Sequence, residues 1–505
     1  MDASAVFVRI YEKLQEVVRS ATAIDVATGI AILCALRITF RIARDKLKTT
    51  RLRGPPRKNL IFGWSQDLLH AEDAGSMYEA WATEALAHFY SKETWTYVPT
   101  EFDLLFIRKN FGKAILCAQG EDHKRQRRSL SPAISHVAIR KLLPVFYNSA
   151  YKAKAAWETL IDANDSHSAI IEVQNWLDTI GIAGFSHDFG SLDGKTTLVV
   201  EVFDSFAVLA PNFPFLPLVQ AFLLLLYMPT ARGDLFGDMN QTLADVSRKI
   251  LERSREEKEA GVIDGKDDKS IIGVLIKAKD AGSDVQLSIE EILAQALLEL
   301  ARNPDIQIKL RTELLAFGSD PTYDQLTNSL PYLDAVVHET LRLHPSLAEF
   351  LRQASSAAED DVIPLSEPVR TKSGRVVNSI SVTRGTQIGI STACINRSTA
   401  IWGADAKVFR PERWLEEGGI PKKAQELQSY RHLLIFVDGP RTCLGKGFAV
   451  AEFKTVIVVL IKSFVFEMRD GPGTQIEMGM GLLPRPRVAG EDGTKLPLRV
   501  SRYEG

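Results

Sequence analysis

The 505-residue chain has few cysteines, almost no net charge and no internal repeat, and each shortage argues against a class of protein. Its four cysteines lie far apart without a Cys-x-x-Cys pair, which argues against a disulfide framework or a zinc site and fits a reducing compartment. A formal net charge of −2 gives no reason to expect nucleic acid as a partner. With 45% hydrophobic and 25% charged residues, the composition is that of an ordinary globular protein.

The N-terminal 53 residues combine a short apolar run with a dense basic flank. Eleven uncharged residues from Val26 to Leu36 fall short of the roughly 20 that span a bilayer. Seven basic residues follow, at Arg37, Arg41, Arg44, Lys46, Lys48, Arg51 and Arg53, before Gly54-Pro55-Pro56 breaks any helix. We predict a membrane anchor and basic linker over 1–53, with a globular domain over 54–505 on the cytosolic side. The alternative is an amphipathic helix lying on the surface.

One cysteine has a chemically distinctive setting. Cys443 lies in the glycine-flanked stretch Phe436-Val437-Asp438-Gly439-Pro440-Arg441-Thr442-Cys443-Leu444-Gly445, just ahead of an apolar helix. A helix N-terminus and a nearby arginine both favour negative charge, so the pattern predicts a thiolate that serves as a metal ligand or a nucleophile. The alternative is an inert free cysteine at a helix–loop junction.

The order Phe-x-x-Gly-x-Arg-x-Cys-x-Gly resembles the haem-binding loop of the cytochrome P450 family. The resemblance implies that Cys443 is the axial ligand of the iron of haem b, which favours O–O cleavage. Phe436, Gly439, Arg441 and Gly445 are the other family positions of this loop. The implied fold class is mainly α-helical with a small β subdomain, forming the cytochrome P450 fold.

A second resemblance concerns buried charge. Glu339 and Arg342 lie three apart in a helical segment from Pro331 to Pro345, so they share one face. Most such pairs are solvated surface pairs, but this segment resembles the Glu-x-x-Arg helix of the same family. Arg413, within a Pro-Glu-Arg segment, would complete a structural triad, because buried charges must be paired.

A haem carries two propionates, so cationic donors should converge on it. The segment from Gly120 to Arg128 resembles the family's Trp-x-x-x-Arg helix, with His123 in place of tryptophan and Arg127 in place of arginine. Arg441 and Arg352 match two further propionate positions. The remaining basic residues, Lys124, Arg125 and Arg128, are expected on an exposed surface where an acidic reductase would dock.

Strand signals are confined to the second half of the chain. From about Asp360 to Ile401 the sequence predicts short paired strands at Val376–Val382 and Gln387–Ile390. Another strand is predicted at Leu496–Val500. The very apolar segment Phe213–Tyr227 falls where the family has a mobile lid, and a buried core helix is the alternative.

Two pieces of the family pattern are absent. The helix over the haem normally carries an acid followed by threonine, but no threonine occurs between Thr242 and Thr312, so no catalytic residue can be assigned. Ser288 and Glu291 predict a capping box, and the helix from Ile289 to Ala301 would be only about 20 Å long. By comparison with the family, we therefore expect the centre of this distal helix, some twenty residues, to be missing.

The second gap is expected between Glu84 and Ala85, where the family places an N-terminal β-hairpin. Two internal excisions in an otherwise well-matched chain favour skipped exons or a mispredicted gene, and a natural pseudoenzyme is the alternative.

Taken together, the resemblance implies a microsomal-type, fungal haem-thiolate monooxygenase of secondary metabolism. It would insert one oxygen atom from O₂ into a lipophilic substrate, with electrons from NADPH through cytochrome P450 reductase, cytochrome b5 being a further candidate donor. The expected location is the endoplasmic reticulum membrane. The alternatives are a haem-binding protein without monooxygenase activity, a chain that binds no haem, and a nucleophilic Cys443.

Overall fold

The structure, a computed structural model, describes most of the second half of the chain and part of the first. The described residues are 96–111, 115–164, 167–173, 288–347, 349–354, 360–479, 485–491 and 495–504, with scattered positions from 28 to 51 and at 241, 248 and 252. They fall into two compact units, each described by itself. One contains Met1–Arg53 and Ser356–Thr386, and the other contains Gly54–Ser355 and Gln387–Gly505.

The smaller unit is built on an antiparallel hairpin of β4 (Asp361–Arg370) and β5 (Val376–Val382). Residues from the basic linker bind along this hairpin. Thr50 exchanges two hydrogen bonds with the backbone of Ser381, at 3.0 and 2.9 Å. Lys48 pairs with Asp360 at 2.9 Å. The linker and the hairpin therefore form one unit, although about 300 residues separate them in the sequence.

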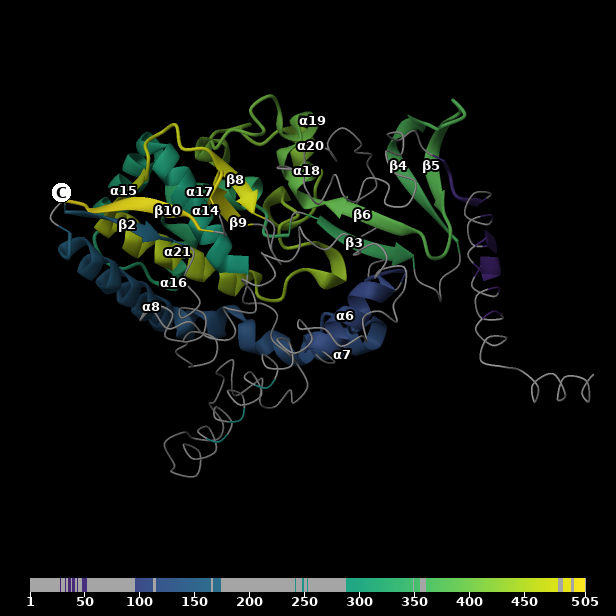
Figure 1. Cartoon of the computed structure of the whole chain (residues 1–505), viewed down its shortest axis with the longest axis horizontal. Coiled ribbons are helices and arrows are strands. Elements are labelled where there is room, and N and C mark those ends of the chain that lie inside the picture. Colours follow the sequence, from purple (N-terminus) through teal and green to yellow (C-terminus); the bar gives the residue numbers. More distant parts are fainter. Residues whose placement is uncertain are drawn as a thin grey trace, which may run out of the picture. The chain divides into compact units, whose positions relative to one another are not determined.

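The larger unit is mainly helical (Figure 1). Its α-helices are α6 (Glu101–Phe111), α7 (Gly120–Leu130), α8 (His136–Asp162), α14 (Ser288–Arg302), α15 (Pro304–Phe317), α16 (Tyr323–Asn328), α17 (Pro331–Leu343), α18 (Thr392–Arg397), α19 (Thr399–Trp402), α20 (Lys422–Gln425) and α21 (Lys446–Ser463). Short 3₁₀ turns are η1 (Ser131–Ile134), η3 (Pro411–Trp414), η4 (Tyr430–His432) and η5 (Gly439–Arg441). The mainly α-helical fold class with some sheet is confirmed.

The core of the larger unit forms where α8 packs along α21 (Figure 1). From Phe448 to Ile461, α21 is buried almost all round, as expected of a central helix. The rings of Phe146 and Phe448 meet edge to face at 4.9 Å between centroids. A Cβ atom at Gly447 would lie 3.0 Å from the side chain of Ile139, so glycine permits this close approach of the two helices.

The described residues of this unit also form two three-stranded antiparallel sheets and a small hairpin. One sheet has the order β2 (Ser168–Glu172), β10 (Pro497–Arg502), β7 (Phe464–Met468), and the other has β1 (Tyr97–Val98), β3 (Glu349–Ala354), β6 (Gln387–Ser391). The hairpin pairs β8 (Ile476–Gly479) with β9 (Arg485–Val488). Strand β10 confirms the predicted C-terminal strand, and its Leu498 and Val500 are fully buried.

The predicted strands Val376–Val382 and Gln387–Ile390 exist, but they do not pair with each other. Strand β5 pairs with β4, and β6 pairs with β3 in a different sheet. The reason is a tight turn before β5, where Gly374 has φ of +87° and its N–H donates to Thr371. The predicted β-rich region also ends early, because residues from Thr392 onward form α18 and α19.

Three predicted features fall outside the described residues. These are the apolar segment Phe213–Tyr227, the position of the missing hairpin between Glu84 and Ala85, and most of Val26–Leu36. Among the helices that the structure describes, none is both long and apolar enough to cross a membrane.

Candidate functional site

Cys443 lies in a loop that closes on itself just before α21. Its backbone N–H donates to the carbonyl of Phe436 at 2.8 Å, which joins the two ends of the loop. Gly439 supplies the turn between them with φ of +66°, a conformation that glycine adopts without steric cost. Gly445 is the N-cap residue of α21, so the sulfur sits at the N-terminus of a buried helix.

The sulfur of Cys443 accepts hydrogen bonds from the backbone N–H groups of Gly445 and Lys446. Burial raises the pKa of this thiol, and this effect outweighs the two hydrogen bonds and the positive charges of Arg127 and Lys446. Burial therefore opposes the thiolate that the sequence pattern predicts, and the thiolate stays a prediction. A bound metal would deprotonate a coordinating thiol at this position.

The arginine that acts on the sulfur is also different from the expected one. Arg127 reaches Cys443 electrostatically, from helix α7. Arg441, two residues before the cysteine, donates to the backbone carbonyls of Leu116 and Ala118 at 3.4 and 2.5 Å. Arg441 therefore ties the cysteine loop to the segment that leads into α7.

His123 and Arg127 lie one turn apart on α7 and converge with Arg441 beside the cysteine loop. Burial and the positive charges of Arg441 and Arg127 lower the pKa of His123 to about 4, so its imidazole is neutral at pH 7. Burial also lowers the pKa of Arg127. Within the described part of the chain, no carboxylate acts on the pKa of either residue. Donors concentrated in this way fit an anionic group such as a haem propionate.

Phe436 and Arg352 are the remaining predicted site residues. Phe436 is buried, and its ring meets that of Tyr430 edge to face at 5.4 Å between centroids. Arg352 lies on β3 opposite Ile388 and is half-buried. Its assignment to a propionate stays a prediction.

Glu339, Arg342 and Arg413 meet in the interior, and all three side chains are at most 1% exposed. Arg342 donates to both carboxylate oxygens of Glu339 in a bidentate pair, from Nη2 at 2.8 Å and from Nε at 3.0 Å. Arg413 Nε lies 3.0 Å from the same carboxylate. Trp414 donates to it at 3.0 Å, and so does the backbone N–H of Arg410. The Glu339 carboxylate therefore accepts five hydrogen bonds, and those from Arg413 and Trp414 join α17 to η3.

Helix α14 begins at Ser288, close to the predicted start, and runs to Arg302. Its residues from Ile292 to Ala301 are buried in the core. Its 15 residues contain no threonine, and at 1.5 Å per residue they extend about 22 Å. Residues 253–287, which precede it, lie outside the described residues.

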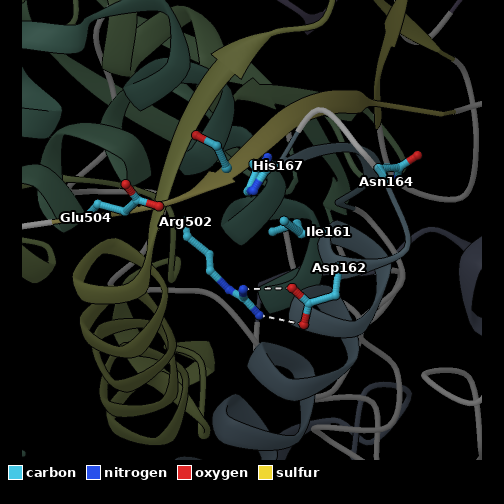
Figure 2. A pocket seen from close by; sticks show the side chains of 7 residues that line it. Ile161, Asp162, Asn164, His167, Arg502 and Glu504 are labelled. Carbon is cyan, nitrogen blue, oxygen red and sulfur yellow. Dashed lines mark hydrogen bonds and ion pairs between the residues drawn. The ribbon is translucent and has the colours of Figure 1, made fainter.

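A polar surface pocket lies where the end of α8 meets the end of β10, as Figure 2 shows. It is lined by Ile161, Asp162, Asn164, His167, Ser501, Arg502 and Glu504. Arg502 and Asp162 form a bidentate ion pair in its wall, with both N–O distances at 2.7 Å. Such a wall does not suit a lipophilic molecule, and the pocket contains none of the residues of the cysteine site.

The sequence reasoning missed Glu452, nine residues after Cys443. Its side chain is 1% exposed, and neither carboxylate oxygen has a hydrogen-bond partner among the described residues. Burial raises the pKa of Glu452 to about 8. The sequence carries a signal for this residue, because Glu452 is the one acidic residue of the largely apolar helix α21.

We expect replacement of Glu452 by glutamine to flatten the pH dependence of stability. Because the folded pKa of about 8 exceeds the ordinary 4.5, the folded chain holds an extra proton between these values, and stability falls as pH rises through this window. The variant should gain about 3 kcal/mol over the native chain at pH 7. Denaturant unfolding across this window measures the gain, with exposed Glu121→Gln as the control. Parallel pH profiles for native chain and Glu452→Gln would contradict the assignment.

The helical fold, the closed cysteine loop and the cationic donors beside it are those of a haem-thiolate protein. The sequence model described as Cytochrome P450 matches residues 85–298 and 293–489 of this chain. The chain therefore belongs to the cytochrome P450 family, a family of haem-iron oxidoreductases.

Fungal relatives match almost the whole chain. Cytochrome P450 monooxygenase claW of Ampulloclitocybe clavipes is 46% identical over 538 residues, covering 96% of this chain and 99% of the relative. Its counterpart claQ is 48% identical over 511 residues, with 90% and 94% covered. Cytochrome P450 monooxygenase 128 of Postia placenta is 30% identical over 555 residues, with 96% and 99% covered. The chain is accordingly an oxidoreductase of the monooxygenase type.

Proposed function

We propose that this chain binds haem b through Cys443 and oxidises a lipophilic organic substrate with dioxygen. The observation that carries the proposal is the placement of Cys443 at the N-terminus of α21, with two backbone N–H groups on its sulfur and His123 and Arg127 beside it. When bound, the haem supplies the activation of dioxygen.

The residues of the chain have separate tasks in this proposal. Cys443 ligates the iron, and Gly445 and Lys446 hold the sulfur in place through their N–H groups. His123 and Arg127 donate to the propionates, with Arg441 and Arg352 as further donors. The neutral imidazole of His123 can still donate one hydrogen bond to a carboxylate.

A carbon monoxide difference spectrum of the reduced protein tests this function. A Soret band typical of a thiolate-ligated haem is the expected result. A chain that takes up no haem, or a haem without the thiolate band, would refute the ligation. Labelling of Cys443 by a thiol reagent, without haem uptake, would instead favour the hypothesis that Cys443 is a nucleophile.

A second candidate function is a haem-binding protein without monooxygenase activity, resulting from loss of the centre of the distal helix and of an N-terminal hairpin. Three observations favour a loss. Thr242 and Thr312 enclose no other threonine. The family match breaks into two segments that meet at 293–298, within α14, and it begins at 85. The alignment with claW spans 538 positions, whereas this chain has 505 residues. At least 33 positions of claW are therefore aligned with gaps in this chain.

Two experiments separate these functions. Product formation that depends on NADPH and reductase supports the monooxygenase, while a thiolate haem spectrum without product supports the inactive form. Sequencing the transcript then decides the origin of the gaps, since a message that encodes the missing helix centre would rule out a natural pseudoenzyme.

We further propose that NADPH–cytochrome P450 reductase docks on the exposed face of α7, with cytochrome b5 as a second candidate. His123 and Arg127 lie on the side of α7 that faces Cys443, and Lys124, Arg125 and Arg128 are exposed. Lys124 pairs with Glu121 at 3.5 Å and Arg125 pairs with Asp122 at 2.9 Å, and both ion pairs are exposed and hence weak. A basic surface on the helix that carries Arg127 would guide an acidic donor to the haem.

Reversing the charge at Lys124, Arg125 and Arg128 should slow haem reduction by the reductase, most strongly at low salt. Stopped-flow reduction measures this rate, with exposed Lys141→Glu as a matched control. The carbon monoxide spectrum should stay unchanged, because these side chains do not face the sulfur. An unchanged reduction rate in the triple variant would refute docking at this face.

The basic flank of residues 37–53 supports a membrane anchor at the N-terminus, with the endoplasmic reticulum as the proposed location. Fractionation of the full chain and of a chain that starts at Gly54 tests this proposal. Release of the shorter chain from membranes is expected, and equal membrane binding of both chains would contradict it.

A further inference from the structure

A phenol, an imidazole and a carboxylate lie in line next to the cysteine loop. Tyr430 is in η4, and His338 and Asp334 lie one turn apart on α17. The ring nitrogens of His338 contact both neighbours, with Nε2 at 3.0 Å from the Tyr430 hydroxyl and Nδ1 at 2.7 Å from the backbone carbonyl of Asp334.

These contacts fix the direction of each hydrogen bond. A backbone carbonyl can only accept, so Nδ1 of His338 carries the hydrogen and donates it to Asp334. Nε2 is then the unprotonated nitrogen, and the hydroxyl of Tyr430 donates to it. The phenolic proton of Tyr430 therefore already points at a base.

A carboxylate lies beside the imidazole of His338. The carboxylate of Asp334 lies 3.3 Å from Nδ1, and the His338 side chain is 1% exposed. Burial raises the pKa of Asp334, but His338 and Lys454 together hold it far below its usual range. Lys454 lies 2.6 Å from Asp334 and exposed Arg431 lies 3.4 Å from it. Asp334 thus remains ionised and can stabilise an imidazolium on His338.

Tyr430 also contacts two residues that hold the sulfur of Cys443. Its ring meets Phe436, whose carbonyl accepts the N–H of Cys443 at 2.8 Å. The ammonium of Lys446 lies 4.9 Å from the ring centre of Tyr430, and the backbone N–H of Lys446 donates to the sulfur. Tyr430 is half-buried, so a reductant in solution can reach it.

We propose that Tyr430 and His338 form a redox site that removes oxidising equivalents from the haem when no substrate consumes them. A hydroperoxide would leave two oxidising equivalents on a bound haem, and for each of them one electron would leave Tyr430 while the phenolic proton moves to Nε2 of His338. The products are a neutral tyrosyl radical and an imidazolium paired with Asp334. An electron from an external reductant, with return of the proton, restores the phenol. This inference rests on the proposed binding of haem at Cys443.

A second tyrosine–histidine pair provides a matched control. The hydroxyl of Tyr323 lies 2.6 Å from Nδ1 of His136, between α16 and the start of α8. No ring contact joins Tyr323 to Phe436 among the described residues. If a tyrosine–histidine hydrogen bond were sufficient by itself, both pairs would behave alike.

Freeze-quench electron paramagnetic resonance of the haem-loaded chain with hydrogen peroxide tests the proposal. We expect a tyrosyl signal in the native chain that Tyr430→Phe abolishes and Tyr323→Phe leaves in place. His338→Gln can accept the hydrogen bond but cannot hold the transferred proton, so it should lower the radical yield several-fold. Haem content and the carbon monoxide spectrum should match the native chain in all three variants.

The same radical yield in Tyr430→Phe, or its loss in Tyr323→Phe, would overturn the proposal. A haem-free arm separates this failure from a failure of the proposed function. A ruthenium polypyridyl photo-oxidant should oxidise Tyr430 faster in the native chain than in His338→Gln, and equal rates would refute the proton transfer. A chain that takes up no haem would refute the proposed function and the role of haem as the oxidant. The photo-oxidant experiment would then still test the proton transfer from Tyr430 to His338.

Discussion

Replacing Cys443 by alanine is expected to abolish the thiolate-type carbon monoxide spectrum completely while the chain stays folded. The sulfur is half-buried in a loop, and the bond that closes this loop is donated by the backbone N–H of Cys443, which alanine keeps. Alanine therefore removes the iron ligand and little of the structure that presents it. Serine at this position should retain some haem, but without the thiolate band.

Cys394 offers the matched control for this prediction. It is 3% exposed in α18, and its backbone N–H bonds to the Ser391 hydroxyl, so its side chain is a buried thiol with a structural setting. Alanine at Cys394 should leave the spectrum intact and reduce only thermal stability. A thiolate band that survives in Cys443→Ala, or is lost in Cys394→Ala, would place the ligand elsewhere.

The sequence predicts a feature well when the residues that determine it are close together in the chain. Local patterns succeeded, since Pro331 at the start of α17 and the spacing of Glu339 and Arg342 place both charges on one face. The protonation of Cys443 could not be read locally, because the burial that raises the pKa of its thiol comes from the packing of distant segments.

Pairing across the chain could not be predicted either. The strands at β5 and β6 were recognised from composition, but their partners are fixed by a turn on one side and by β3 on the other. His338 and Tyr430 are 92 residues apart, and no local spacing brings a histidine to a tyrosine. Glu452 differs from these, since the one acidic residue of a largely apolar helix is a signal that a single sequence carries.

The largest effect on stability is expected from replacing Glu339 by glutamine. The substitution keeps the volume but removes the carboxylate that Arg342 and Arg413 share among the described residues, while Arg413 keeps that of Asp405 at 3.4 Å. Arg342 retains the carbonyls of Asn396 and Ala406 on its Nη1, but they do not neutralise its charge. Removing one partner from a buried ionic cluster costs about 3–5 kcal/mol, because an uncompensated charge stays in the interior.

Chemical denaturation of the haem-loaded chain measures this cost as a shift of the unfolding midpoint, and the loss of the Soret band follows the same transition if α17 and η3 hold the haem site. The exposed pair of Arg140 and Asp324, at 2.5 Å, is the matched control. Alanine at Arg140 should change stability by no more than about 1 kcal/mol, because solvent screens an exposed pair. If Glu339→Gln were as mild as Arg140→Ala, the carbonyls around Arg342 rather than the carboxylate would hold these segments together.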